Sequence, residues 1–307
     1  MPSVKLICGN AHPALGTCLA EELRMPIASA EVTAFADGEI RVYIAEDVLH
    51  ATVCILQPTC TPVNDNLLTL ALLVDAARAA GAAQIVAIVP YFGYARQEQR
   101  ARRGDPRSAQ VACRLLGSVG VNHLVTLDLH APALESALPM PATLLNADEV
   151  FLPRIRNWGL RNLVVVSPDA GGIKRAQRYA AALETPVVAI AKQRSGPDVT
   201  SALQVLGDVK DRACLVVDDM ASTGRTLSGA ADALRQAGAR EIYGIFTHAV
   251  MAPGADDRLL SARFTKLLTS DSVPVVATPW LEVVPIASLL AKTFRYLIGA
   301  EKASPRT

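Results

Sequence analysis

The sequence has few aromatic residues, few charges and no excess of either sign. Aromatic residues occupy 5% of the 307 positions, charged residues occupy 19%, and the formal net charge is +1. Because no sustained run of lysine and arginine is present, nucleic acid is not expected as a partner. Hydrophobic residues still account for 51% of the chain, which indicates a globular protein with a sizeable core and excludes a disordered one.

Long apolar runs are also missing. The stretch LLTLALLV (67–74) ends at Asp75, and no run reaches the ~18 residues that a membrane-spanning helix needs. The first ten residues lack the apolar segment and the small-residue cleavage site of a secretory signal. The six cysteines form no C-x-x-C pair, and Cys54 and Cys214 lie inside strand-like apolar runs, which is typical of small buried hydrophobes. These absences predict a cytoplasmic protein without a membrane partner.

Short apolar runs alternate with alanine- and leucine-rich helical patterns along the chain, which predicts βαβ units and a mostly parallel sheet. The segments that begin at Cys54 and Cys214 resemble each other, since both read strand, loop, helix, R-x-A-G-A and a second strand. Gly81 and Gly238 occupy equivalent places after the helix, where a left-handed glycine commonly ends it. A repeat of this length indicates duplicated domains rather than a solenoid.

The duplication predicts an α/β fold of two tandem domains, each a mostly parallel sheet flanked by helices. The expected domains are residues 1–145 and 146–307. The halves differ at the end of the strand that begins each of the two similar segments. The second half has Asp218 and Asp219 there, and the first half has Gln57 and Pro58. The acidic pair is therefore not needed to build the fold, and a functional role explains it better.

The segment after the acidic pair has the composition of a phosphate-binding turn. ACLVV (213–217) predicts a buried strand and TLSGAADALRQAG (226–238) a helix, so the residues between them form a turn at the carboxyl end of a strand. Such a turn presents backbone N–H groups at a helix N-terminus, and hydroxyls and a glycine suit a bound phosphate. The turn residues are Ser222, Thr223, Gly224, Arg225 and Thr226.

The two aspartates would repel a phosphate that they touched. Asp218 and Asp219 are better suited to accept hydrogen bonds from sugar hydroxyls, directly or through a metal ion. A phosphate at one end and a diol at the other describe a phosphorylated pentose. A Walker A sequence is absent, which excludes a P-loop nucleotide site. The alternative is a turn whose aspartate, serine and threonine side chains only cap the helix.

The string VVDDMASTGRTL (216–227) resembles the phosphoribosyl-pyrophosphate (PRPP) binding motif of type I phosphoribosyltransferases and PRPP synthases. Five further strings resemble the ribose-phosphate pyrophosphokinases, or PRPP synthases, in that family's order: FADGEIRVYI (35–44), PYFGYARQEQRAR (90–102), DLHA (128–131), SPDAGGIKRA (167–176) and KQRSGPDVTSALQVLGDVKDR (192–212). The resemblance covers nearly the whole chain. It implies two phosphoribosyltransferase-like domains. The reaction that it implies transfers the β,γ-diphosphoryl group of MgATP to the 1-hydroxyl of ribose 5-phosphate, giving PRPP and AMP.

Catalytic and nucleotide-binding residues follow from the resemblance position by position. Lys192 and Arg194 match the family's K-x-R pair in a catalytic loop, where cations that close over the site stabilise the transition state. The residues that match ATP-binding positions are Phe35, Asp37, Glu39, Arg96 and Gln97. The first three belong to an adenine-binding loop that a neighbouring subunit supplies in the family. The resemblance therefore implies a dimer-based homo-oligomer, which in the family is usually a hexamer.

Magnesium is the cofactor that the resemblance implies. His130 and Asp169 match the family's Mg²⁺ positions, and Asp128 is a supporting candidate. Since Mg²⁺ prefers carboxylates and water, the histidine is the less typical ligand and could act through a water. The acidic pair and the turn that follows it match the family's ribose 5-phosphate site.

Two other functions compete with this interpretation. A non-catalytic paralogue that regulates PRPP synthases predicts loss of the K-x-R pair or of the acidic pair, and both are present. A salvage phosphoribosyltransferase, which uses PRPP made elsewhere, predicts a single domain without the FADGEI and YARQ strings. The duplication and these strings favour an active PRPP synthase.

Overall fold

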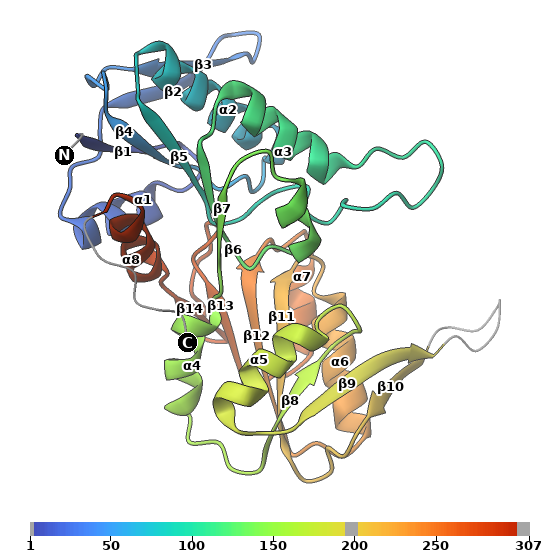
Figure 1. Cartoon of the computed structure of the whole chain (residues 1–307). Helices are drawn as coiled ribbons and strands as arrows, with labels where there is room; N and C mark the ends of the chain where they lie inside the picture. The colour runs from blue at the N-terminus through green and yellow to red at the C-terminus, as the bar shows by residue number, and fades with distance from the viewer. Residues whose placement is uncertain (1–2, 194–201, 300–307) are drawn as a thin grey trace. The chain divides into compact units, whose positions relative to one another are not determined.

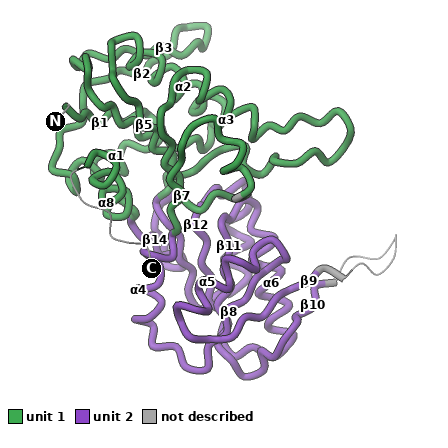
Figure 2. Tube along the Cα trace, in the orientation of Figure 1, with its two compact units in different colours: residues 1–146, 272–274, 286–307 green, residues 147–271, 275–285 purple. Residues whose placement is uncertain are grey.

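The structure is a computed structural model that describes residues 3–193 and 202–299 (Figure 1). The chain forms two compact units, coloured separately in Figure 2. The described residues of unit 1 are 3–146, 272–274 and 286–299, and those of unit 2 are 147–193, 202–271 and 275–285. Each unit is built around a sheet of its own.

Unit 1 contains a five-stranded parallel sheet with the order β1-β4-β5-β6-β7. Its strands are β1 (Val4–Cys8), β4 (Thr52–Leu56), β5 (Gln84–Val89), β6 (His123–Leu127) and β7 (Ala142–Leu145), and its helices are α1 (Pro13–Leu23), α2 (Val63–Ala79), α3 (Ser108–Val119), the 3-10 helix η1 (Pro132–Ala137) and α8 (Ala287–Leu297). A separate antiparallel hairpin, β2 (Ala30–Ala34) and β3 (Ile40–Ile44), packs against α2. Every residue of β4 is buried, and after Thr52 its sequence is apolar without alternation, as expected for a strand covered on both faces.

Unit 2 contains a seven-stranded sheet with the order β10-β9-β8-β11-β12-β13-β14. Its strands are β8 (Leu163–Ser167), β9 (Val187–Gln193), β10 (Ala202–Leu206), β11 (Ala213–Ala221), β12 (Glu241–Ala249), β13 (Lys266–Ser270) and β14 (Leu281–Val284), and its helices are α4 (Asp148–Arg156), α5 (Ile173–Leu183), α6 (Arg225–Gln236) and α7 (Ala255–Ser261). Strand β10 runs antiparallel to β9, and the other pairs are parallel. The two sheets confirm the predicted α/β class.

The C-terminal helix packs in the first unit, whereas the sequence led us to expect a continuous second domain over residues 146–307. Helix α8 lies against α1, and Nη2 of Arg295 donates a hydrogen bond of 2.5 Å to the carbonyl oxygen of Glu22. Leu290 and Phe294 of α8 are buried. An amphipathic pattern shows that a helix face is covered, but it does not show which domain covers it.

The glycines expected to end equivalent helices both have the left-handed conformation. Gly81 has a φ of 86° and Gly238 a φ of 85°. Each donates its N–H to a carbonyl in the last helical turn, Gly81 to Arg78 at 3.0 Å and Gly238 to Arg235 at 3.1 Å. These bonds satisfy carbonyls that the helix leaves without partners, as the R-x-A-G-A repeat predicts.

Sheet register gives the correspondence between the two units. Thr52 pairs with Gln84, the first residue of β5, and Ala213 pairs with Glu241, the first residue of β12. Since β5 and β12 follow the equivalent helices, Thr52 corresponds to Ala213.

Counting from that pair places Gln57 at the position of Asp218, as the sequence comparison indicated. It also corrects that comparison by one residue, because Cys54 corresponds to Leu215 and not to Cys214. The two cysteines matched by residue type alone, whereas hydrogen-bonded register fixes the face on which each side chain lies.

Gln57 joins a buried amide network at this position. Its side chain is fully buried, and Oε1 accepts a hydrogen bond of 3.1 Å from the backbone N–H of Ala11. Its Nε2 lies 3.3 Å from Oδ1 of Asn10 and 3.3 Å from Oδ1 of Asn66. The place that holds a carboxylate in unit 2 is therefore occupied in unit 1 by neutral groups that satisfy one another.

We expect the Gln57→Met variant to lower the free energy of unfolding by about 2 kcal/mol, because buried partners of the glutamine lose their hydrogen bonds. Urea unfolding followed by circular dichroism measures this change. The control is Gln84→Met at an exposed glutamine of β5, for which the expected change is within about 0.5 kcal/mol. Equal losses in the two variants would contradict a stabilising role for the network.

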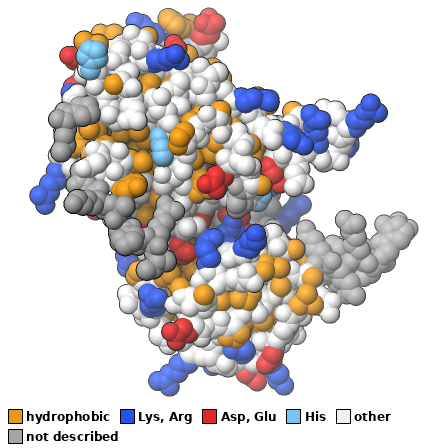
Figure 3. Space-filling model, viewed as in Figure 1, with side chains coloured by type: hydrophobic (Ala, Val, Ile, Leu, Met, Phe, Trp, Pro, Cys, Tyr) orange, Lys and Arg blue, Asp and Glu red, His pale blue; other side chains and the backbone are white. Residues whose placement is uncertain are grey.

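Among residues 3–193 and 202–299, no helix is both long enough and apolar enough to span a bilayer. On the face displayed in Figure 3, side chains of both charge signs are interspersed with hydrophobic ones in both units. This distribution agrees with the low net charge of the sequence.

Candidate active site

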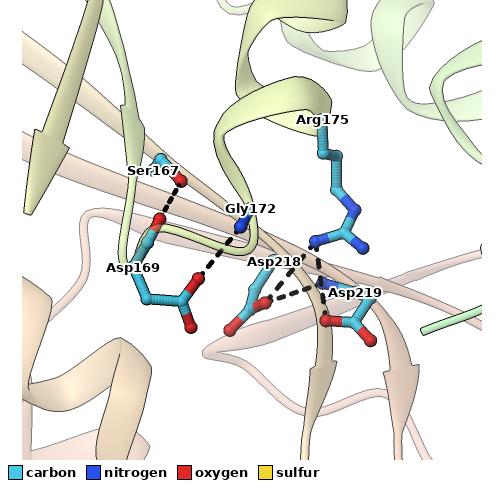
Figure 4. A network of polar contacts seen from close by, with 6 residues as sticks. All are labelled: Ser167, Asp169, Gly172, Arg175, Asp218 and Asp219. Carbon is cyan, nitrogen blue, oxygen red and sulfur yellow. Dashed lines mark hydrogen bonds and ion pairs between the residues drawn. The ribbon is translucent and has the colours of Figure 1, made fainter. Parts of the chain in front are cut away.

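The acidic pair lies near the carboxyl end of β11, the central strand of the unit 2 sheet, at the edge formed by the carboxyl ends of the parallel strands. Strand β11 pairs in parallel with β8, so the turn after β8 lies at the same edge. Figure 4 shows Asp169 from that turn close to Asp218 and Asp219 from β11, with Arg175 reaching toward the pair from α5. Strand order therefore gathers residues that are distant in the chain.

Arg175 binds both carboxylates of the pair. Its Nη1 lies 3.7 Å from Oδ1 of Asp218 and 3.5 Å from Oδ1 of Asp219. Only 13% of the arginine side chain is exposed, against 11% and 5% for the two aspartates, so water screens the three charges weakly. No role for Arg175 was predicted from the sequence. The available signal was that two adjacent aspartates in a buried strand need a cation, which the sequence does not locate.

The environment of Asp218 opposes its ionisation. Burial raises the pKa of this carboxyl well above its ordinary value of 3.8, and the charge and hydrogen bonding of Asp219 raise it further, while the Arg175 guanidinium acts in the opposite direction. The backbone N–H of Asp219 also donates a hydrogen bond of 2.9 Å to Oδ1 of Asp218. The pair thus offers acceptor oxygens, held in place by one cation, to hydroxyl groups.

The turn after the pair leads directly into α6. Gly224 is the N-cap of this helix with a φ of 72°, and it is buried, while Thr223, Arg225 and Thr226 are exposed and Ser222 is partly buried. The first turn of α6 has backbone N–H groups without helical partners, which attract an anion. Arg225 is the first residue of the helix, and its side chain lies at the surface.

Asp169 is an exposed carboxylate held in a defined orientation. Its Oδ1 accepts a hydrogen bond of 2.9 Å from the N–H of Gly172, and its carbonyl oxygen accepts one of 2.7 Å from Oγ of Ser167. A Cβ at Gly172 would lie 2.9 Å from Oγ of Ser167, so a larger residue would displace the hydroxyl that binds the Asp169 carbonyl. The remaining carboxylate oxygen, Oδ2, suits a hard cation.

The other two predicted metal ligands belong to unit 1. Asp128 follows β6 directly with a φ of 38° and is 7% exposed, and its N–H donates to the carbonyl of Leu145 at 2.9 Å. His130, two residues further on, is exposed. Within the described ranges, no three or more histidine, cysteine, aspartate or glutamate side chains gather closely enough to hold a metal ion by themselves.

The predicted adenine loop is the tip of the β2–β3 hairpin. Phe35 is 53% exposed, and the guanidinium carbon of Arg41 lies 5.9 Å from the centre of its ring. Asp37 and Glu39 are also exposed, and Oδ1 of Asp37 accepts a hydrogen bond of 3.2 Å from the Glu39 N–H. An aromatic ring presented on an ordered hairpin is suited to stack on a planar base.

The predicted ATP-binding residues Arg96 and Gln97 lie in the segment after β5 and are exposed. Oε1 of Gln97 accepts a hydrogen bond of 2.8 Å from Oγ of Ser108, at the start of α3. This bond orients the amide, while the arginine side chain remains at the surface of unit 1.

The catalytic pair is the least described part of the predicted site. The backbone of Lys192 belongs to β9 and pairs with Leu203 of β10. The side chain of Lys192 and all of Arg194 lie outside the described residues.

Two family models together match most of the chain. Residues 4–120 match the model of the N-terminal domain of ribose phosphate pyrophosphokinase, and residues 135–282 match the phosphoribosyl transferase domain. The ribose-phosphate pyrophosphokinase of Vibrio parahaemolyticus is 38% identical over 310 residues, covering 99% of each chain. That of Haemophilus influenzae is 39% identical over 311 residues, also covering 99% of each.

A solved structure agrees with these relatives. The crystal structure of phosphoribosylpyrophosphate synthetase from Mycobacterium smegmatis superposes with a TM-score of 0.92 at 32% identity, covering 97% of this chain and all of that one. The predicted pair of phosphoribosyltransferase-like domains is thereby confirmed. With its sheet topology and full-length relatives in agreement, the chain belongs to the ribose-phosphate pyrophosphokinase family.

Proposed function

We propose that this protein transfers the diphosphoryl group of ATP to the 1-hydroxyl of ribose 5-phosphate, giving PRPP and AMP. The observation that carries this proposal is at the carboxyl ends of the unit 2 strands. There a buried acidic pair is followed by a turn that presents backbone N–H groups at a helix N-terminus. Membership in the family supports the same activity.

The acceptor sugar is bound at this edge. Its 5-phosphate accepts hydrogen bonds from the turn 222–226 and from the first turn of α6. Its hydroxyl groups donate to Asp218 and Asp219, whose oxygens Arg175 holds in place. The 1-hydroxyl oxygen attacks the β-phosphorus of ATP, and the bond from that phosphorus to the oxygen that bridges it to the α-phosphorus breaks. AMP leaves with that oxygen, and the hydroxyl proton passes to solvent.

We assign ATP binding to residues of unit 1. We assign stacking on adenine to Phe35, with Asp37 and Glu39 on the same hairpin, and phosphate contacts to Arg96 and Gln97. The hairpin tip is exposed, and we propose that a neighbouring copy of the chain supplies it, which makes a dimer the smallest competent assembly. In the transition state, Lys192 and Arg194 stabilise the charge on the migrating diphosphoryl group.

Magnesium fits the donor set of this chain. The anchored carboxylate of Asp169 offers a hard oxygen ligand, and Mg²⁺ is commonly held by one or two carboxylates together with substrate phosphates, so an all-protein cage is not required. We assign Asp169 as the principal ligand, with His130 and Asp128 as further candidates. When bound, the metal ion neutralises charge on the phosphate oxygens of ATP.

The test supplies MgATP and ribose 5-phosphate to the purified protein and measures AMP and PRPP together. Equal amounts of both products are expected. Release of AMP without PRPP would indicate ATP hydrolysis, and no AMP above background, with phosphate tested as activator, would refute the activity. Consumption of added PRPP with a free base would instead indicate a salvage transferase, and an inactive protein that alters an active PRPP synthase would indicate a regulatory paralogue.

A further inference from the structure

The backbone of the phosphate-binding turn is tied to the segment that follows β12. Three consecutive carbonyl oxygens of the turn accept hydrogen bonds from this segment: that of Ala221 from the N–H of Met251 at 3.0 Å, that of Ser222 from the N–H of Ala252 at 2.9 Å, and that of Thr223 from Nη1 of Arg258. The first two donors are fixed backbone groups. The third is a side chain from α7.

These bonds decide which way the amides of the turn point. Across a planar trans peptide, the C=O of one residue and the N–H of the next point in opposite directions. Since the carbonyls of Ser222 and Thr223 face the segment after β12, the N–H groups of Thr223 and Gly224 face away from it. Neither amide donates a hydrogen bond to another group in the described part of the chain.

Helix α7 also packs directly against the turn. A Cβ at Gly224 would lie 3.2 Å from Cγ of Leu259 and 3.3 Å from the carbonyl oxygen of Ala255. Met251 has a φ of 45°, a left-handed conformation that costs a residue other than glycine roughly 1 kcal/mol. Strain of this kind commonly occurs where the backbone serves a function.

We propose that Arg258 is a positioning residue for the sugar phosphate: by holding the Thr223 carbonyl, it turns the amide of Gly224 toward the ligand, beside the Thr223 amide that the Ala252 N–H orients through the Ser222 carbonyl. This inference rests on the proposed binding of ribose 5-phosphate at the turn. Arg258 acts through the backbone, because the guanidinium nitrogen that contacts the turn is bound to a carbonyl oxygen. Its role differs from that of Arg175, which binds carboxylates directly.

The test compares Arg258→Met, which removes the donor and its charge, with Arg258→Lys, which keeps both. The methionine variant should raise KM for ribose 5-phosphate about tenfold, as loss of one hydrogen bond to a charged ligand does, with kcat changed less than about threefold. Because this contact is proposed to be the same in the bound sugar and in the transition state, its loss is expected to fall on KM. The lysine variant should recover most of the affinity.

Two controls separate positioning from charge and from folding. Arg263→Met removes an exposed arginine that lies beyond the end of α7, and its KM should equal that of the unmodified protein. The tenfold difference of Arg258→Met should persist when ionic strength is raised, whereas a long-range attraction of the phosphate would weaken. Thermal unfolding by circular dichroism checks that each variant is folded.

The inference and the proposed function fail in different ways. If the unmodified protein makes PRPP and Arg258→Met has an unchanged KM for ribose 5-phosphate, the positioning role is refuted and the activity stands. A difference that vanishes at high ionic strength also refutes it. If no PRPP forms, calorimetric titration with ribose 5-phosphate still decides the inference. Weaker binding by the folded methionine variant than by the unmodified protein supports it. Equal binding by the two proteins, or no binding by the unmodified protein, overturns it. Should that variant not fold, the folded Arg258→Gln variant, which keeps a shorter neutral donor, takes its place under the same criteria.

Discussion

The Lys192→Ala variant is expected to lose about three orders of magnitude in kcat, while its KM for ATP changes less than about threefold. Negative charge on the migrating diphosphoryl group is redistributed in the transition state, and a cation placed to meet it there stabilises that state more than bound ATP. The backbone of Lys192 lies in β9, where it pairs with Leu203 of β10. Steady-state kinetics with varied ATP measures both constants.

The matched control for this variant is Lys210→Ala. Lys210 is an exposed lysine of the same unit, between β10 and β11, and its removal should leave both constants unchanged. Equal losses in kcat and in ATP affinity would show that Lys192 is only a ground-state phosphate ligand. Unchanged kinetics would remove it from the catalytic residues.

The second large effect is expected for Asp219→Asn, which should raise KM for ribose 5-phosphate roughly 10- to 100-fold. An amide oxygen accepts fewer hydrogen bonds than a carboxylate, and the amide N–H₂ is a donor that cannot pair with the Arg175 guanidinium. Only 5% of the Asp219 side chain is exposed, so water replaces the lost partner poorly. Calorimetric titration with ribose 5-phosphate should show the same loss of affinity.

The same variant should change the pH dependence. Burial and the Asp219 charge raise the pKa of Asp218, so binding that needs an ionised Asp218 weakens as the pH falls through that raised value. Removing the Asp219 charge lowers the pKa of Asp218, and the acidic limb of kcat/KM for ribose 5-phosphate should move to lower pH. The control Asp232→Asn alters an exposed aspartate of α6 paired with Arg235 and should move neither KM nor the limb. An unchanged KM in Asp219→Asn would refute the diol assignment.

Much of the fold could be predicted because short-range patterns in the sequence indicate its strands, helices and helix ends. Apolar runs of strand length, helical periodicity and the glycines after helices are read within a few residues, and the two sheets and Gly81 and Gly238 confirm them. Residue type was less reliable for aligning the two halves. Cys54 and Cys214 looked equivalent, but the sheet register assigns Cys54 to Leu215.

The candidate site also contains residues that local sequence patterns predict and residues that only the folded structure reveals. The sequence identified Asp218, Asp219 and the turn after them, since their composition and order within one βα unit carry the signal. Arg175 and Arg258 could not be assigned, because each meets its partners through strand order and helix packing. The roles given to the predicted site residues stay predictions until the variants are measured.

By itself, the sequence determined that the chain is a duplicated α/β protein, that its halves differ in an acidic pair, and which family it resembles. Only the tertiary structure decided that Gln57 fills the equivalent place in unit 1 with a neutral network, that α8 covers α1, and that one arginine contacts both aspartates while another holds the turn. The physical reason is that local patterns specify which face of an element is buried. Partners across a sheet or between helices depend on register and strand order, which the folded chain alone sets.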